Sequence, residues 1–368
     1  MLGVAIFLSI PVSLPGGMGA IDFRPYWSSS FLFARGQDFS NSESIYHVEQ
    51  TLTGWNETYT MSAWFAPTGN LVLAPFTLLP FTQAAYYWLL INVVAVFLSA
   101  LLLWRDAQKY AWIALAITFG FSATLLSLIF GQVNTLVLFG LALFLFFSQT
   151  GRGFSAGASL ALTTVKPHLV VLTLPLLLLD ALRRREWRVL GGFAATLGVC
   201  VLLMFLLNPL WPVSFWQVVT SGMGSFREAP SIPGVLVANG NSNGKWLWLI
   251  ALLAGVVIWW FKKASQSQRT LMDVSVMVGL LVLPIGWSYD QIMLLLPLLH
   301  VAEWGVKGIL PKSDALIITI VLILANLFSF YQRTLPLGDV WFVWMPVLVL
   351  LIYLFAWKRK RLNIVNNV

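Results

Sequence analysis

The feature that most constrains this chain is its succession of long apolar runs, separated by short polar or basic segments. An α-helix of about 20 apolar residues spans the hydrocarbon core of a bilayer. Of the 368 residues, 59% are hydrophobic and only 10% are charged, whereas soluble domains average about 25% charged residues. The chain therefore lacks the polar groups needed to cover a surface in water, and its sequence predicts an all-α polytopic membrane protein.

Basic clusters between the apolar runs set the predicted topology. Lys and Arg concentrate in cytoplasmic loops, so the net charge of +8 indicates membrane orientation and no nucleic-acid partner. The strongest clusters are Arg183–Arg185 with Arg188, Lys262 and Lys263 with Arg269, and Lys358–Arg361. Together with the apolar runs they predict about twelve transmembrane helices with both chain ends in the cytoplasm.

The apolar runs also locate the individual spans. They are 2–19, 84–104, 111–130, 133–149, 154–166, 168–182, 189–207, 245–261, 271–287, 290–304, 314–331 and 340–357. The first is read as a transmembrane helix and not as a signal peptide, because no basic residue precedes it. The proline-flanked segment 68–82 is predicted to be re-entrant or interfacial. If it crossed the membrane, every later basic cluster would lie on the opposite side. Spans 154–166 and 168–182 meet at Pro167 and are predicted to form a broken pair.

This topology leaves the longer polar segments on the extracytoplasmic side. The segment 20–66 forms a long first loop, which we expect to contain interfacial helices, and 208–244 forms a second. The cytoplasmic turns are short, so we expect one membrane domain over 1–368 with its chemistry on the outer face. The single cysteine, Cys200, excludes an internal disulfide. The three histidines form no zinc motif, and we expect no metal and no cofactor.

Asp22 is the leading candidate for a catalytic group, because it directly follows the first predicted span. A carboxylate at the mouth of a membrane cavity is a plausible general base for an acceptor hydroxyl. The alternative is that Asp22 caps the helix that begins near Arg24. Tyr26 belongs to an aromatic stretch that is typical of a membrane interface.

Two polar interruptions of apolar runs supply further candidates. Gln132 and Asn134 lie in a turn and are expected either to bind a sugar or only to form the turn. Lys166, with His168 beyond Pro167, lies inside an apolar stretch, where a positive charge needs a partner. A phosphate on a lipid carrier is one such partner; a salt bridge to an acid such as Asp290 is the alternative.

The remaining candidates lie later in the chain. Arg227 and Lys245 are further phosphate candidates or, alternatively, solvated loop residues. Trp287, Tyr289 and Asp290 occupy a predicted hairpin tip, where the tryptophan suits stacking on a sugar. Capping of the next helix is the alternative for Asp290.

The order of these motifs resembles glycosyltransferase family 87, within the GT-C superfamily of multi-spanning enzymes. The matching stretches are Asp22-Phe23-Arg24-Pro25-Tyr26-Trp27, Gly36-Gln37-Asp38-Phe39, Phe65-Ala66-Pro67, Leu78-Leu79-Pro80, Gly131-Gln132-Val133-Asn134, Lys166-Pro167-His168 and Trp287-Ser288-Tyr289-Asp290. Two of them depart from the family pattern: Asp38-Phe39 replaces an Asp-Pro, and Phe65-Ala66-Pro67 replaces a Tyr-Pro-Pro. These departures affect what the resemblance implies about the identity of the acceptor more than what it implies about the type of reaction.

The resemblance implies a GT-C-like fold and an inverting transfer of a hexose, typically mannose, from a polyprenyl-phosphate donor to a glycan or glycolipid acceptor. It implies that Asp22 is the base, that Lys166 and His168 bind the donor phosphate, and that the Gln132–Asn134 and Trp287–Asp290 turns line the cavity. It also favours a prokaryotic plasma membrane with an extracytoplasmic active site. A secondary transporter or a flippase for lipid-linked intermediates is the alternative function.

Overall fold

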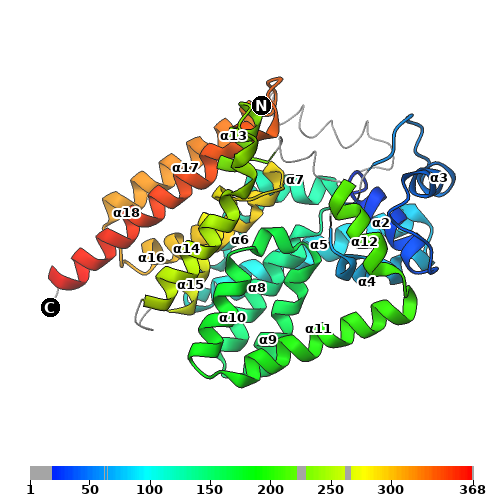
Figure 1. Ribbon diagram of the computed structural model, residues 1–368. Helices are drawn as coiled ribbons and strands as arrows, with labels where there is room; N and C mark the ends of the chain where they lie inside the picture. Colours follow the sequence, from blue (N-terminus) through cyan, green and yellow to red (C-terminus); the bar gives the residue numbers. More distant parts are fainter. Residues whose placement is uncertain (1–18, 62, 64, 222–228, 262–266, 367–368) are drawn as a thin grey trace. The chain divides into compact units, whose positions relative to one another are not determined.

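The computed structural model describes residues 19–61, 63, 65–221, 229–261 and 267–366 (Figure 1). Within these ranges every regular element is an α-helix or a 3-10 helix, and no strand is present. The predicted all-α class is confirmed. The first predicted span, 2–19, falls almost entirely outside the described residues, as do Lys262, Lys263 and Arg227.

Among the residues that the structure describes, five helices are long and apolar enough to cross a membrane, and a sixth span arises if one bent helix pair is counted as a unit. The five contain α5 (Phe81–Leu103), α11 (Trp187–Leu207), α14 (Leu247–Phe261), α17 (Lys312–Gln332) and α18 (Trp344–Asn366). The bent pair joins α6 (Ala111–Gly120) to α7 (Ser122–Phe130), with a bend of 62°. The chain is therefore an integral membrane protein, and the count of twelve spans stays a prediction.

The other predicted spans correspond to shorter helices. They are α8 (Asn134–Gln149), α9 (Gly153–Ala161), α10 (Thr173–Arg183), α15 (Gln268–Leu281) and α16 (Leu295–Val306). The segment 68–82 folds mainly as α4 (Pro67–Leu73) and the 3-10 helix η1 (Ala74–Leu78). At about 1.5 Å of rise per residue, α4 is too short to cross a bilayer, in agreement with a re-entrant or interfacial segment.

The described chain forms two compact units. Unit 1 comprises the described parts of Met1–Val96, Leu126–Pro167 and Glu186–Gly224, and unit 2 those of Phe97–Leu125, His168–Arg185 and Ser225–Val368. The single domain expected from the sequence stays a prediction.

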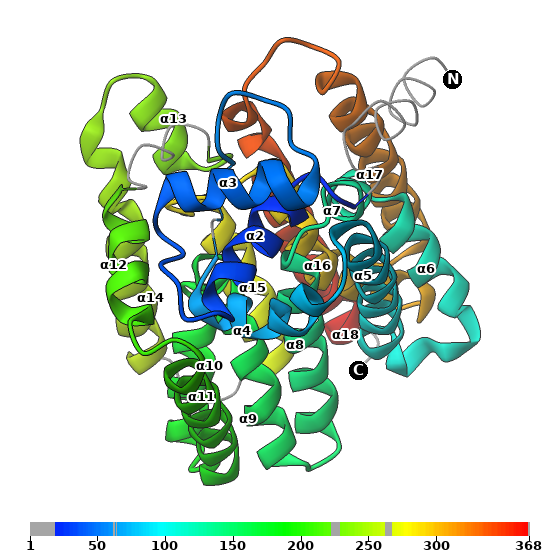
Figure 2. The ribbon, with the colours of Figure 1, turned by 90° about the vertical axis from the view of Figure 1, so that its right-hand side faces the viewer.

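In unit 1, two helices of the first loop pack with the helix that follows it. Helix α2 (Phe23–Phe33) contacts both α3 (Ser42–Thr53) and α4 (Figure 2). The side-chain oxygen of Asn70 on α4 accepts hydrogen bonds from Ser29 and Ser30 on α2, both at 3.0 Å. The expected helices of the first loop are present, and α2 and α4 are joined by buried polar contacts.

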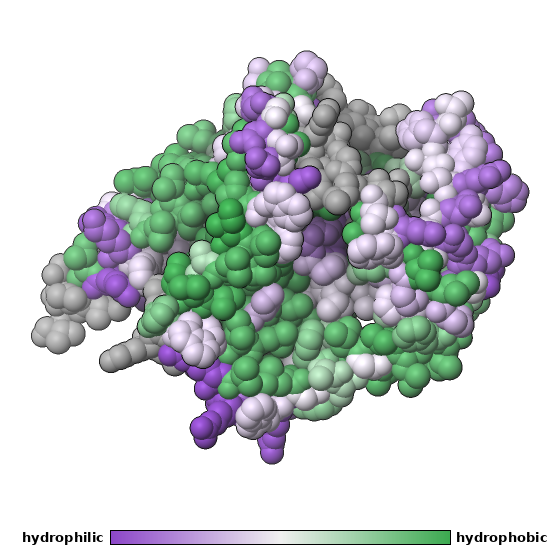
Figure 3. Space-filling model, in the orientation of Figure 1, coloured by the Kyte–Doolittle hydropathy of each residue, from purple (hydrophilic) through white to green (hydrophobic). Residues whose placement is uncertain are grey.

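Helices α9 and α11, also in unit 1, approach each other closely through glycines. A Cβ atom on Gly157 would lie 1.8 Å from the carbonyl oxygen of Val189, and one on Gly192 would lie 2.1 Å from that of Phe154. Small residues allow such close backbone approach in membranes, where packing replaces the hydrophobic effect as the force between helices. On its outer side α11 exposes Leu202, among other apolar side chains, which gather as one surface (Figure 3).

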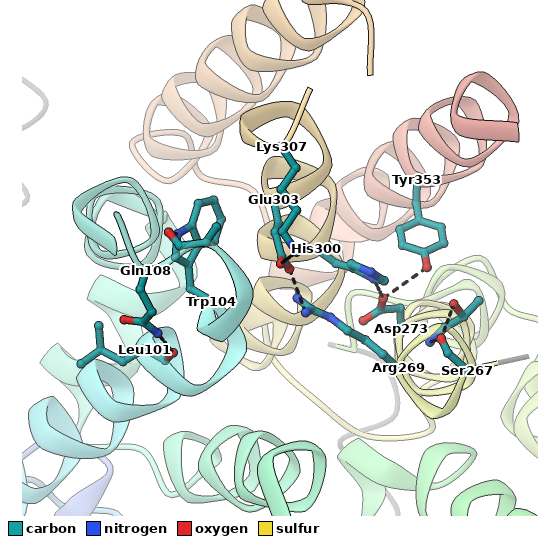
Figure 4. A network of polar contacts seen from close by, with 12 residues as sticks. Leu101, Trp104, Gln108, Ser267, Arg269, Asp273, His300, Glu303, Lys307 and Tyr353 are labelled. Carbon is teal, nitrogen blue, oxygen red and sulfur yellow. Dashed lines mark hydrogen bonds and ion pairs between the residues drawn. The ribbon is translucent and has the colours of Figure 1, made fainter. Parts of the chain in front are cut away.

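In unit 2, a network of charged side chains joins α15, α16 and α18 (Figure 4). Glu303 pairs with Arg269 at 2.9 Å and with Lys307 at 2.6 Å. Asp273 bonds to the imidazole of His300 and accepts a hydrogen bond from Tyr353 at 3.2 Å. Each buried carboxylate thus has partners on neighbouring helices, which offsets the cost of removing its charge from water.

The glycine contact between α9 and α11 yields a direct test. We predict that Gly157→Ala lowers the free energy of unfolding by about 1–3 kcal/mol, because its new methyl group would displace the backbone of α11. The midpoint of thermal unfolding in detergent measures this effect. Gly198→Ala on α11 is the matched control, since a Cβ there meets nothing within 4 Å. Equal midpoints for the two variants would contradict the close approach.

Candidate active site

Three segments of unit 1 that are far apart in sequence meet at the side-chain amide of Gln132. Its nitrogen donates a hydrogen bond to a carboxylate oxygen of Asp22. Its oxygen accepts one from the ammonium of Lys166 at 3.1 Å and one from the hydroxyl of Tyr26 at 2.9 Å. Gln132 and Lys166 are fully buried, and Asp22 is half-buried. A single neutral amide therefore links a carboxylate, a cation and a phenol.

The backbone holds Asp22 against the turn that carries Gln132. The amide nitrogen of Asp22 donates to the carbonyl oxygen of Phe130 at 2.8 Å, and that of Gly19 donates to Ile129 at 2.8 Å. Gly131 has a φ of +73°, and a Cβ on it would lie 2.0 Å from the carbonyl oxygen of Gly19. Only glycine satisfies both demands, so the Gly-Gln turn is what allows Asp22 and Gln132 to meet.

Asp22 occupies the N-cap position of α2, but its carboxylate makes no capping hydrogen bond to that helix. The carboxylate instead accepts a hydrogen bond from Gln132. Capping, the alternative that the sequence offered for Asp22, is therefore not the interaction seen.

Lys166 lies where helical geometry stops. The 3-10 helix η3 (Leu162–Val165) ends before it, and the φ and ψ of Lys166 are −140° and 70°. The carbonyl oxygens of the two residues before Lys166 accept hydrogen bonds from the start of α4. The backbone nitrogen of Ala66, just before α4, donates to Val165 at 3.1 Å. The hydroxyl of Thr68, within α4, donates to Thr164 at 2.8 Å. The break predicted at Pro167 thus frees backbone groups that are satisfied by the segment at the start of α4.

The two polar residues of the turn have different surroundings. The amide of Asn134 donates to the hydroxyl of Ser127 at 3.0 Å, which braces the turn against the end of α7. The carbonyl oxygen of Gly131 accepts from the indole of Trp88 at 2.7 Å. Gln132 joins the carboxylate and the cation, whereas Asn134 supports the turn that presents it.

The hairpin candidates belong to unit 2. The rings of Trp287 and Tyr289 stack with centroids 5.9 Å apart. A carboxylate oxygen of Asp290 accepts from the backbone nitrogen of Trp287 at 3.1 Å, so Asp290 does cap the 3-10 helix η7 (Ser288–Leu294).

Sequence reasoning gave no role to Arg333 and Asp339 of unit 2, which meet this hairpin. Both the backbone nitrogen and the hydroxyl of Ser288 donate to Asp339, and Arg333 donates to that hydroxyl at 2.9 Å. Burial lowers the pKa of Arg333 to about 10, against the opposing charge of Asp339, so the guanidinium stays charged near neutral pH. An isolated arginine between the apolar runs 314–331 and 340–357 is the sequence signal that could have identified it.

The other phosphate candidates, His168 and Lys245, are half-buried residues of unit 2. The ammonium of Lys245 lies 5.5 Å from the ring centroid of Trp246. Among the described residues, no group of three His, Cys, Asp or Glu side chains is arranged to hold a metal ion. The phosphate roles of His168, Lys245 and Arg227 stay predictions.

A second charged pair in unit 1 also escaped sequence reasoning. Arg24 on α2 and Glu49 on α3 are both almost fully buried. The guanidinium of Arg24 lies 4.7 Å from the ring centroid of Trp55, and Glu49 accepts from the backbone nitrogen of Met61 at 3.1 Å. Burial raises the pKa of Glu49 to about 7, against the opposing effects of the Met61 N–H and the charge of Arg24. This carboxyl therefore ties the segment at Met61 to α3.

Comparisons with known proteins place the chain among glycosyltransferases. The model of glycosyltransferase family 87 matches residues 64–284. An alpha-(1->3)-arabinofuranosyltransferase of Mycolicibacterium smegmatis is 28% identical over 256 residues, which are 64% of this chain and 53% of that protein. One of Mycobacterium tuberculosis is 30% identical over 249 residues, which are 63% and 51% of the two chains. The chain spans about half the length of these curated relatives, and no solved structure matches it.

The buried Glu49 predicts a pH-dependent contribution to stability. An unfolded glutamate has a pKa of about 4.3, below the value of about 7 in the folded chain. Between these values the unfolded chain has released the proton that the folded chain keeps, so the contribution of Glu49 falls as the pH rises. We predict that Glu49→Gln raises the midpoint of thermal unfolding, relative to the wild-type chain, more at about pH 8 than at about pH 5.

Glu57→Gln is the control, because Glu57 is an exposed carboxyl of the same loop. Its midpoint should follow that of the wild-type chain at both pH values. If the unfolding midpoint of Glu49→Gln differed from that of the wild-type chain by the same amount at both pH values, the result would contradict the raised pKa of Glu49.

Proposed function

Since the chain belongs to glycosyltransferase family 87, we propose that it transfers a sugar from a polyprenyl-phosphate donor to a hydroxyl acceptor, with inversion and with Asp22 as the general base. The observation that carries the proposal is the contact of Gln132 with both Asp22 and Lys166. A membrane glycosyltransferase that uses a lipid-linked donor needs a base and a cation near one another, and these are the two groups that the amide joins.

In the proposed reaction one carbon–oxygen bond forms, another breaks, and one proton is transferred. The acceptor oxygen attacks the anomeric carbon, its proton passes to Asp22, and the bond from that carbon to the donor phosphate oxygen breaks. Negative charge grows on the departing polyprenyl phosphate, and the ammonium of Lys166 stabilises it. A side-chain carboxylate that takes a proton in this way contributes typically about 10²–10⁴-fold to the rate.

The neutral amide of Gln132 explains how a base and a cation coexist in one buried site. Gln132 donates to the carboxylate of Asp22 and accepts from the ammonium of Lys166, so one neutral side chain holds both charged groups in place. We therefore assign Gln132 a positioning role, with Tyr26 as its second donor.

The identity of the sugar is the least constrained part of the proposal. The sequence led us to expect mannose, but the curated relatives carry the name arabinofuranosyltransferase and give mannose no support. We propose an arabinofuranosyl donor as the first substrate to test and a mannosyl donor as the second. Asn134, Trp287, Tyr289 and Asp290 remain the proposed lining for sugar or acceptor, and the outer face remains the proposed side of the reaction.

The rival function, a transporter or flippase, makes a different prediction for the same preparation. Purified chain with a polyprenyl-phosphate sugar and an acceptor should yield glycosylated product if it is a transferase. Movement of the lipid-linked sugar across the vesicle membrane without any glycosylated product would favour a transporter or flippase.

Replacement of the proposed base tests the reaction directly. We predict that Asp22→Asn lowers the rate of sugar transfer by about 10²-fold or more, while the affinity for the donor stays within a factor of about two. Single-turnover transfer and donor titration measure the two quantities. Glu57→Gln, which alters an exposed carboxyl of the same loop, should transfer at the wild-type rate. Full activity of Asp22→Asn would remove the general-base role.

Replacement of the proposed phosphate ligand separates binding from chemistry. We predict that Lys166→Met, which keeps an apolar stem and removes the charge, weakens donor binding by about tenfold, since hydrogen bonds to charged groups contribute about 1.5–3 kcal/mol. A polyprenol that lacks the phosphate should bind the variant and the wild-type chain equally. Unchanged affinity for the phosphorylated donor would defeat this role for Lys166.

A further inference from the structure

Unit 2 contains a groove between α10, α14 and α15, with a volume of about 380 Å³. Its walls are mainly apolar, and no residue of the proposed reaction lines it. The wall residues include Leu172 just before α10 and Leu176 within it, Ala254 and Gly255 from α14, and Leu271 and Val278 from α15. The groove is thus a lipophilic slot formed by three helices.

One end of this groove is basic. Arg183 and Arg184 line it there, together with Asp180. Arg184 pairs with Asp180 at 2.7 Å, and Arg183 donates to the carbonyl oxygen of Trp259 at 3.0 Å. The segment 180–188 carries four arginines against the two carboxylates of Asp180 and Glu186, so this end of the groove has a net positive charge.

The helix that forms one wall faces lipid. No residue of α14 is buried, and its exposed apolar side chains include Ile250, Leu253 and Ile258. A groove whose wall is a lipid-facing helix opens to hydrocarbon, so a soluble anion would leave most of it empty. A molecule that fills it needs an apolar chain along the helices and one negative group at the arginines.

We propose that this groove binds an anionic phospholipid, with its phosphate on Arg183 and Arg184 and an acyl chain along α10, α14 and α15. Basic pockets between transmembrane helices bind anionic headgroups in this way. The acyl chain supplies apolar contacts to α14, which has no buried residue of its own, so bound lipid stabilises the folded chain by mass action. The proposal does not depend on sugar transfer.

The test uses the full chain, purified in detergent and titrated with phosphatidylglycerol. Phosphatidylcholine with the same acyl chains tests the charge, and glycerol phosphate tests whether a headgroup alone suffices. We expect phosphatidylglycerol to raise the midpoint of thermal unfolding and to appear as a single bound lipid in native mass spectrometry. The other two ligands should have less than a third of that effect.

Variants separate this site from general attraction to a basic surface. Arg183→Gln with Arg184→Gln should weaken phosphatidylglycerol binding by roughly 30-fold, at about 1 kcal/mol per arginine. Arg188→Gln is the matched control: it removes charge from the same cluster but does not line the groove, and it should bind as the wild-type chain does.

A second variant tests the groove without altering any charge. A Cβ on Gly255 would lie at an ordinary contact distance, 3.7 Å, from Leu176, and the groove of about 380 Å³ has room for the rest of a leucine side chain, so we expect α14 to tolerate Gly255→Leu. This variant should keep the lipid-free unfolding midpoint and lose the stabilisation by phosphatidylglycerol. Equal stabilisation by phosphatidylcholine, equal losses in the Arg188 control, or full lipid stabilisation of Gly255→Leu would each overturn the proposal.

Discussion

A charged side chain inside a membrane protein must find a polar partner, and the candidate site is built on one such pairing. Lys166 is fully buried, and the amide oxygen of Gln132 accepts a hydrogen bond from it. Because the same amide donates to Asp22, satisfying the lysine also fixes the position of the carboxylate. One neutral side chain thus couples the two charged groups to which we assign the proposed sugar transfer.

Irregular backbone makes this coupling possible. Gly131 turns with a positive φ and lies against Gly19, while Lys166 interrupts the helical geometry after η3. Non-helical backbone at membrane depth is tolerated only where protein satisfies its polar groups. Here the segment around α4 does so by binding the carbonyl oxygens of Thr164 and Val165. The segment at the start of α4 therefore helps to hold Lys166 in place.

The charged groups of the chain fall into sets with different roles. The Asp22–Gln132–Lys166 set leaves the carboxylate half-exposed, as the proposed role of general base requires. The Asp273–His300–Tyr353 set is buried between helices, where it fastens α15, α16 and α18. Arg183 and Arg184 line the end of an apolar groove, next to its apolar wall residues. The three sets therefore differ in how far their charged side chains are exposed.

By itself, the sequence determined that this is a helical membrane protein and picked out Asp22, Gln132 and Lys166, because hydropathy and isolated polar residues are local properties. It did not determine which of them touch. Gln132 lies 110 residues from Asp22, and only the folded chain turned Gln132 toward the carboxylate and Asn134 toward Ser127. Likewise, only the packing of α3 on α2 buried Glu49 near Arg24, since burial depends on neighbours that local sequence does not name.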